Sequence, residues 1–264
     1  MRGGAGSVTL RHGGMFTIVG EAVGNFNPAP TTGRSPVPDP FASLPAPSAD
    51  GLPVRSSARF RITGTRILSP GYYRGGWEID GTALLRPGLY YIDGGGVSVK
   101  GGGSLYSIDA AATETTDATW SSNCTPTACG VLIFNTGQDS MGGIVAAGSH
   151  RIRLRGYDPL ADMLALGLSQ YTGIAIWQDA FPAPAANRVQ PEMVLKGDNA
   201  LEIVGGLYLP SARLTLVGNQ DGTFAQFDTP SALVVFDLKL QGSSDIRLRF
   251  DGNAFQQYDY GLAD

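Results

Sequence analysis

The chain has 264 residues, of which 42% are hydrophobic, 16% are charged and 37 are glycine, with a formal net charge of −4. The hydrophobic content excludes a disordered chain, and the absence of a Gly-X-Y period excludes a collagen-like one. The small negative charge gives no reason to expect binding to nucleic acid or to an anionic membrane. The length fits one large β domain or two smaller ones.

The first 57 residues divide into two segments. Residues 1–26 contain short apolar runs around Gly13 and Gly14 and predict N-terminal strands, or a first coil of the fold that follows. Residues 27–57 are dense in proline, which excludes a helix and a central strand. Phe41 and Leu44 are apolar anchors within this segment, so we expect an extended strap along the domain surface rather than a free linker.

The stretch 77–99, WEIDGTALLRPGLYYIDGGGVSV, determines the expected architecture. It predicts three short strands separated by glycine corners, with no helix between them. The sequence Pro-Gly-Tyr-Tyr at 70–73 returns as Pro-Gly-Leu-Tyr-Tyr at 87–91. Such repetition is typical of parallel β-helices, whose coils bury their inner faces by stacking on one another. We therefore predict that residues 58–264 form a single right-handed parallel β-helix, an all-β solenoid.

Residues 103–129 interrupt the repeated strands. They are polar, rich in threonine and aperiodic, so we expect a loop insert. Cys124 and Cys129 lie in this segment, where a local disulfide is the preferred interpretation and two free thiols the alternative. A disulfide would indicate an oxidising compartment.

Residues 158–166, DPLADMLAL, predict one short helix. Asp158 can cap its first turn, and the proline that follows suits the first helical position. Leu160, Met163 and Leu164 would then share one face. Such a helix would cover one side or one end of the stack.

Several aromatic residues of the repeated strands are candidates for contact with sugar rings. The alternative is a core role, because one residue of each Tyr-Tyr pair should point inward in an alternating strand. The candidates are Tyr72, Tyr73, Trp77, Tyr90, Tyr91 and Trp177.

The acidic residues are scattered singly, without an Asp-Asp pair or an Asp-x-Asp motif. Asp179, after the strand in GIAIWQD, has the strongest claim to a special role, although a structural corner that accepts backbone N–H groups is the preferred interpretation. Asp198 and Asn199, and the segment 219–222, are candidate calcium corners. They lack the spaced oxygens of known calcium coils, so we interpret them as turns and expect no cofactor.

Four motifs occur in a characteristic order: PGLYYIDGGGVSV (87–99), GVLIFNT (130–136), GIAIWQD (173–179) and GGLYLPSARLTLVGN (205–219). Together they resemble the glycine-rich C-terminal region of TadG-like proteins, which are TadE/TadG-type envelope proteins linked to bacterial tight-adherence (Flp) pili. The proline-rich DPFASLPAP (39–47) is similar to a stretch that commonly precedes this region. The resemblance covers about residues 39–242, and the membrane helix of full TadG-like chains is absent from it.

The resemblance implies an extracellular or envelope-exposed bacterial protein, exported as part of a longer chain, and carries over no catalytic residues. We predict a non-enzymatic structural or adhesive module that displays its loops to surface, envelope or pilus proteins. Polysaccharide is a further expected partner, nucleic acid is not, and no membrane span is expected in this chain. Open terminal coils would allow end-to-end self-association.

A polysaccharide-acting enzyme or a glycan-binding module is the alternative, because parallel β-helices often carry pectin lyases and polygalacturonases. Hydrolysis needs a pair of carboxylates on either side of the bond. Lysis needs a calcium-binding acidic cluster and a base. Stacking of coils can bring distant single acids together, so the sequence leaves this alternative open.

Overall fold

The structure is a computed structural model, and the part of the chain it describes is almost free of helix. For the strands β1, β19 and β21 the description covers the backbone and not the side chains. No helix in the described part is long and apolar enough to span a membrane. The described residues are 2–9, 18–35, 38–112, 129–137, 141–148, 150–180, 191–197, 200–218, 225–229, 233–241 and 246–250.

Short strands make up most of the fold, and all the described pairings between them are parallel. The predicted all-β class is confirmed. The elements are β1 (Arg2–Thr9), β2 (Val23–Asn27), β3 (Val54–Ser56), β4 (Phe60–Ile62), β5 (Thr65–Leu68), β6 (Gly71–Arg74), β7 (Trp77–Ile79), β8 (Thr82–Leu85), β9 (Gly88–Asp93), β10 (Val97–Val99), β11 (Ser104–Ser107), β12 (Val131–Thr136), β13 (Ile144–Ala146), β14 (Arg151–Arg155), the 3-10 turn η1 (Ser169–Tyr171), β15 (Ile174–Gln178), β16 (Met193–Gly197), β17 (Ala200–Val204), β18 (Gly206–Gly218), β19 (Ala225–Thr229), β20 (Leu233–Gln241) and β21 (Ile246–Phe250).

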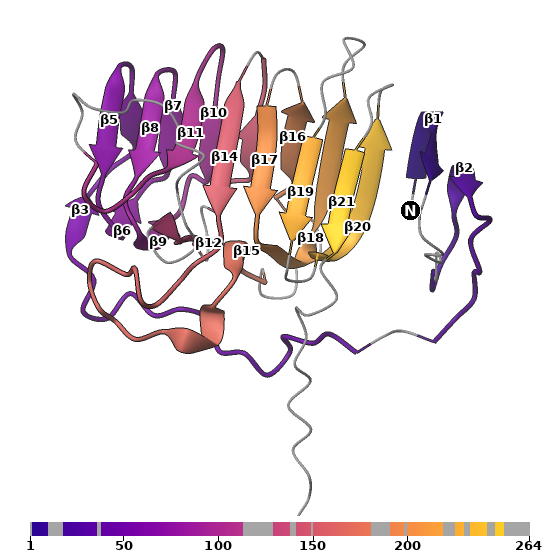
Figure 1. Cartoon of the computed structure of the whole chain (residues 1–264), viewed down its shortest axis with the longest axis horizontal. Coiled ribbons are helices and arrows are strands. Elements are labelled where there is room, and N and C mark those ends of the chain that lie inside the picture. Colours follow the sequence, from indigo (N-terminus) through magenta and orange to yellow (C-terminus); the bar gives the residue numbers. More distant parts are fainter. Residues whose placement is uncertain are drawn as a thin grey trace, which may run out of the picture.

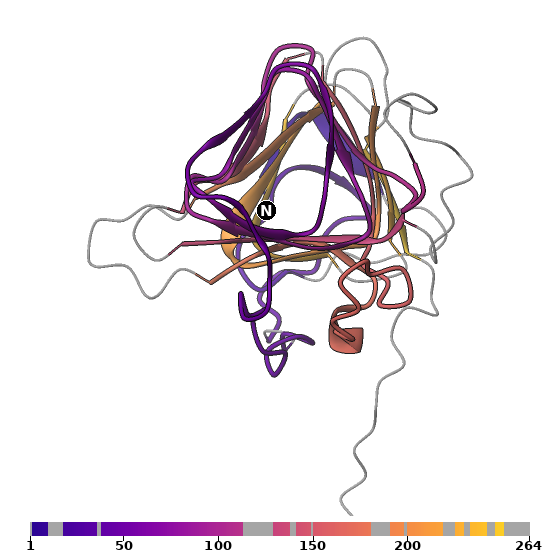
Figure 2. The same cartoon turned by 90° about the vertical axis from the view of Figure 1, so that its left-hand side faces the viewer.

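The strands from β3 onward form three columns, because each strand from β3 to β15 pairs with the strand three places further along the chain. Strands β16 and β17 pair with β18 and β19, two places further on. One column runs β3-β6-β9-β12-β15-β18, the second runs β4-β7-β10-β13-β16-β18, and the third runs β5-β8-β11-β14-β17-β19-β21. The long strand β18 pairs with both β15 and β16 and so joins the first two columns. Viewed along the stack, the backbone traces a triangle around one interior (Figure 2).

The interior of the triangle is apolar and in register. In β7 and β10, Trp77 pairs with Val97 and Ile79 pairs with Val99, and all four side chains are buried. Glu78, which lies between Trp77 and Ile79 on β7, is only half-buried, as expected for alternation along a strand. Burial of each such apolar side chain contributes about 1.5–3 kcal/mol.

Successive turns of the chain approach closely at a corner made of glycines, which are Gly75, Gly76, Gly95, Gly96, Gly142 and Gly143. A Cβ atom on Gly95 would clash with the carbonyl oxygen of Gly75, and one on Gly76 would clash with the carbonyl oxygen of Gly96. The N–H of Trp77 donates to that same oxygen of Gly96 at 2.8 Å. The hydrogen-bond ladder therefore continues through the corner because no side chain separates the two backbones.

The two Tyr-Tyr pairs stack with an offset. Tyr72 pairs with Tyr91, and Tyr73 pairs with Ile92, so the two pairs are displaced by one position in the register. Tyr73 and Tyr90 lie in the interior cluster, whereas Tyr72 and Tyr91 pack against a second cluster outside it. The prediction that one member of each pair belongs to the core is confirmed.

The predicted helix over 158–166 is wrong, because this segment consists of turns and irregular backbone. The carboxylates of Asp158 and Asp162 accept hydrogen bonds from the N–H groups two residues on, those of Leu160 (2.8 Å) and Leu164 (3.0 Å). Such local bonds compete with the helical pattern. Leu160 is 84% exposed, so the leucines do not form one buried face.

The predicted loop insert 103–129 begins with a strand. Strand β11 is buried along its whole length and pairs with β8 and β14. Its sequence SLYS holds two serines in four residues, so the apolar pattern was too short to be recognised. The hydroxyl of Ser107 accepts a hydrogen bond from the N–H of Arg155 at 3.1 Å, which satisfies one of these buried polar groups. Residues 113–128 lie outside the described part of the chain.

The described part of the strap runs along the outside of the stack (Figure 1, purple trace below the strands). It connects β2 to β3, which begins the first column. Strand β1 pairs with β20 through Arg2 with Lys239 and Gly3 with Leu240. The strap therefore connects β2, whose partner β1 pairs with β20 at one end of the stack, to β3 at the other end.

We expect Gly95→Ala to destabilise the protein more than Gly101→Ala. Both glycines have a positive φ, +68° and +55°, so both substitutions incur a backbone cost of about 1–2 kcal/mol. At Gly95 the added Cβ also meets the backbone of Gly75, whereas nothing lies within 4 Å of it at Gly101. Overpacking of this kind costs about 1–3 kcal/mol more.

Urea unfolding of the two variants measures this difference directly. Equal losses of free energy of unfolding in the two variants would show that the close approach of successive turns does not limit stability.

Candidate functional site

One outer side of the triangle carries a continuous row of aromatic side chains, which we call the aromatic ladder. Its members come from five successive strands of the first column, and adjacent ring centroids lie 5.7, 5.1, 5.7 and 4.7 Å apart. Aromatic pairs of this kind contribute about 0.5–1.5 kcal/mol each beyond the burial of their area. The ladder consists of Tyr72 (β6), Tyr91 (β9), Phe134 (β12), Trp177 (β15) and Tyr208 (β18).

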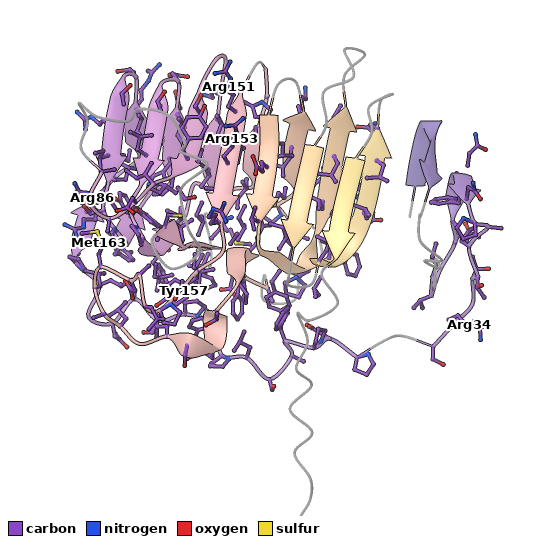
Figure 3. All side chains as sticks on the ribbon, viewed as in Figure 1. Arg34, Arg86, Arg151, Arg153, Tyr157 and Met163 are labelled. Carbon is purple, nitrogen blue, oxygen red and sulfur yellow. The ribbon has the colours of Figure 1, made fainter. Side chains whose placement is uncertain are left out.

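The strap and the segment 157–171 cover most of this ladder. Phe41 of the strap meets Tyr208 edge-on with ring centroids 5.2 Å apart, and Tyr171 meets Trp177 at 5.7 Å. Tyr157 lies among the side chains at the boundary of stack and cover (Figure 3). The ladder is consequently buried from its third member onward, while the first two tyrosines remain half-buried.

Three tyrosines around the ladder donate hydrogen bonds to carboxylates. The hydrogen bond to Asp93 is the main cause that raises the pKa of Tyr72. For the other two, burial is the main cause of the raised pKa and the neighbouring carboxylate adds to it. The pairs are Tyr72 with Asp93, Tyr157 with Asp162 (2.9 Å) and Tyr208 with Asp39 (2.8 Å).

A row of polar side chains, which we call the polar column, lies two residues beyond the ladder on each of four strands. It consists of Arg74, Asp93, Thr136 and Asp179. Arg74 and Thr136 both pair in register with Asp93, and the hydroxyl of Thr136 donates to the carboxylate of Asp179 at 2.7 Å. Asp93 and Asp179 are thus separated by about two strand spacings, roughly 9–10 Å.

The half-buried end of the ladder and the polar column together form the candidate site. Asp93, Asp179 and Asp50 all lie close enough to Tyr91 to raise the pKa of its hydroxyl, although burial is the larger cause. Tyrosine rings offer stacking faces, and carboxylates and arginine offer hydrogen-bond acceptors and donors to hydroxyl groups. This combination is suited to a polar ligand with apolar faces, such as a sugar ring.

The aromatic residues proposed from the sequence do not share one surface. Tyr73, Trp77 and Tyr90 point into the interior and are 2%, 0% and 0% exposed. The hydroxyl of Tyr90 donates to backbone carbonyls there, so its polar atom is satisfied inside the core. Trp177 is buried within the ladder, at 3% exposed. Of the six, Tyr72 and Tyr91 alone are half-buried at the surface.

Sequence reasoning proposed Asp179 but missed the other three members of the polar column. Asp179 follows its strand, as expected, and its carboxylate accepts a bond from a threonine hydroxyl. A signal for the whole column exists: an aromatic residue, one intervening residue and a polar residue recur as YYR, YID, FNT and WQD. Because each column stacks in register, this spacing repeats on the same outer face in four successive turns.

Other predicted residues fall partly outside the described chain. Cys129 is fully buried and is not a free thiol, but Cys124 is not among the described residues, so their pairing stays a prediction. Asp198, Asn199 and the segment 219–222 also lie outside the described residues. Within the described ranges, no group of three or more His, Cys, Asp or Glu side chains could hold a metal ion.

Comparison with known proteins gives no relative. No family model, no curated protein and no solved structure matches the chain. The resemblance to TadG-like proteins therefore remains an expectation, and the candidate site rests on its geometry.

We expect Tyr208→Phe to reduce the amount by which the free energy of unfolding falls at alkaline pH. In the folded protein the pKa of Tyr208 is raised by burial and by Asp39, so the folded state keeps a proton that the unfolded state loses above about pH 10. The stabilisation is therefore complete below about pH 10 and falls as the pH rises towards the folded pKa.

Denaturant unfolding at neutral pH and at about pH 11 measures both effects. The variant should lose about 1 kcal/mol at neutral pH, from the missing hydrogen bond, and less than the wild type on going to alkaline pH. An unchanged pH dependence would mean that Tyr208 ionises alike in both states.

Proposed function

We propose that this chain is a right-handed parallel β-helix that serves as a non-enzymatic attachment module of the TadG-like type. The parallel columns, the single apolar interior and the stacked glycine corners support this architecture. Its role is structural or adhesive: a rigid stack holds connecting segments toward a cell surface or a pilus protein.

The observation that carries this proposal is the covered aromatic ladder. Three of its five members, Phe134, Trp177 and Tyr208, are at most 5% exposed, because the strap and the segment 157–171 cover them. Its burial therefore contributes to the stiffness of the stack rather than to capture of a ligand. A stiff stack fixes the spacing of its connections, since neighbouring strands lie about 4.8 Å apart.

The connections that leave such a stack are the parts available for display. The longest connections between strands that follow β4 are 108–130, between β11 and β12, 156–173, between β14 and β15, and 179–192, between β15 and β16. The second of them packs against the aromatic ladder, so we assign the display role to the first and the third. We place the module in the bacterial envelope or outside the cell, as part of a longer chain. A disulfide between Cys124 and Cys129 would suit that oxidising environment.

Deletion of the gene from its source bacterium tests the role. Piliated cells are counted by electron microscopy and cells retained on glass are counted alongside. We expect pili to persist while attachment falls, and complementation with Gly101→Ala to restore attachment better than Gly95→Ala, because the second variant weakens the stack. Loss of pili would instead assign the protein to pilus assembly, and no change in either count would contradict the attachment role.

Glycan binding is the second candidate function, favoured by the half-buried tyrosines beside the polar column. Tyr72 and Tyr91 stack with ring centroids 5.7 Å apart, next to Asp93 and Asp179. The backbones that carry these two aspartates are about two strand spacings, roughly 9–10 Å, apart, and inverting glycosidases hold their two carboxyl groups about 6.5–9.5 Å apart.

Binding to immobilised polysaccharides, with Asp80→Asn as the matched control, tests this second function. Asp80 is a half-buried carboxylate on another side of the triangle, where it pairs with Arg61 at 2.8 Å. We expect Tyr91→Ala to weaken binding about tenfold, the loss of one aromatic contact, and Asp80→Asn to leave it unchanged. Asp93→Asn should weaken it by a smaller factor, because the carboxylate of Asp93 already accepts from Tyr72. Release of reducing ends or unsaturated products, abolished in Asp179→Asn, would make the protein an enzyme. No binding and no product would exclude both.

A further inference from the structure

The docked part of the strap, residues 38–50, contacts the stack as a bound peptide would. Two tyrosine side chains bond to it: Tyr208 of the ladder donates to the carboxylate of Asp39 at 2.8 Å, and Tyr171 of the neighbouring segment 157–171 donates to the carbonyl of Pro45 at 2.9 Å. Phe41 inserts beside Tyr208. Aromatic grooves whose hydroxyl or indole groups bind carbonyls are the usual receptors of proline-rich peptides.

The docked part also folds by local bonds of its own. The N–H of Phe41 donates to the carboxylate of Asp39 at 2.9 Å, and the N–H of Leu44 donates to the carbonyl of Phe41 at 2.8 Å. These turns present Phe41 and Leu44 together toward the ladder. A segment that holds its own shape loses less conformational entropy on binding, which favours binding from a separate chain as well.

The connections at both ends of the strap would allow it to detach from its own stack as one unit, like the exchanged arm of a domain-swapped dimer. Gly51, with φ +75° and no atom within 4 Å of a built Cβ, lies between the docked part and β3. Beyond its other end, β1 pairs with β20 through two residue pairs. An arm attached in this manner can be exchanged between copies, because the exchanged contacts are identical to the original ones.

We propose that the groove formed by the aromatic ladder and Tyr171 binds the proline-rich segment 38–50 of a second copy of this chain. In the monomer the chain's own segment fills the groove, and in a dimer two copies exchange segments about a two-fold axis. This inference shares the covered ladder with the proposed attachment role, but it is tested by the oligomeric state and the other by attachment, so either can fail alone.

Two complementary full-length variants test the exchange. The strap variant, Phe41→Ala with Leu44→Ala, keeps the groove but lacks the anchors, and the groove variant, Tyr208→Ala, keeps the strap but lacks its partner for Phe41 and Asp39. When they are mixed with tags of different mass, light scattering and pull-down should detect a heterodimer that neither variant forms alone. A mixture with no more dimer than the separate variants would overturn the proposal.

A peptide experiment keeps the test valid if the groove variant does not fold. A fluorescent peptide of residues 38–50 is titrated into the full-length strap variant and into the wild type. We expect binding to the strap variant that is about tenfold or more tighter than to the wild type, whose own strap competes at high effective concentration. A peptide that carries Phe41→Ala should bind about tenfold more weakly, the value of one aromatic contact. Equal binding of the two peptides would overturn the proposal.

Discussion

The close contact of successive backbones at the glycine corner determines the register of the stack. Gly75 and Gly76 meet Gly95 and Gly96 with no room for a Cβ, so the turns can approach closely enough for Trp77 to donate to Gly96. Once the register is fixed there, alternation sends every second side chain inward along each short strand. Like residues then stack on like residues, which produces both the apolar interior and the aromatic rows.

The same register places aromatic side chains next to one another on the outer side of the first column. An exposed ladder of five aromatic residues would be a large apolar patch, which soluble proteins rarely leave open. The chain covers it with its own proline-rich strap and with the segment 157–171. Proline suits this position because the cover lies on side chains and needs no ladder hydrogen bonds. The buried Asp162, which bonds Tyr157, Leu164 and Leu166, holds the second cover in its turns.

The all-β class was predictable from the sequence, because short glycine-bounded strands and a repeat were visible, and several other features were not. Three strands within 77–99 were predicted because glycines bound them and the Tyr-Tyr motif recurs, but the structure has four, and β8 was missed. The exact pairing was not predictable from the motif, because the paired residues Tyr72 and Tyr91 lie 19 apart while the motif recurs after 17. Strand β11 takes its stability from two neighbouring strands, which local sequence does not reveal. The apolar spacing of 158–166 suggested a helix, but Asp162 favoured turns by bonding the local backbone. The polar column follows from register, which a single motif does not determine.

The hydrogen bonds within the polar column reduce the free energy that this column could gain by binding a ligand. The carboxylate of Asp93 already accepts from Tyr72, and that of Asp179 already accepts from Thr136. A sugar hydroxyl would have to replace one of these donors, and an exchange of one hydrogen bond for another yields little net free energy. Stacking on the half-buried rings of Tyr72 and Tyr91 would then have to supply most of the affinity. The bonds as they stand connect adjacent turns of the stack, which is the behaviour expected of a stiffening element and favours the structural role over the glycan-binding one.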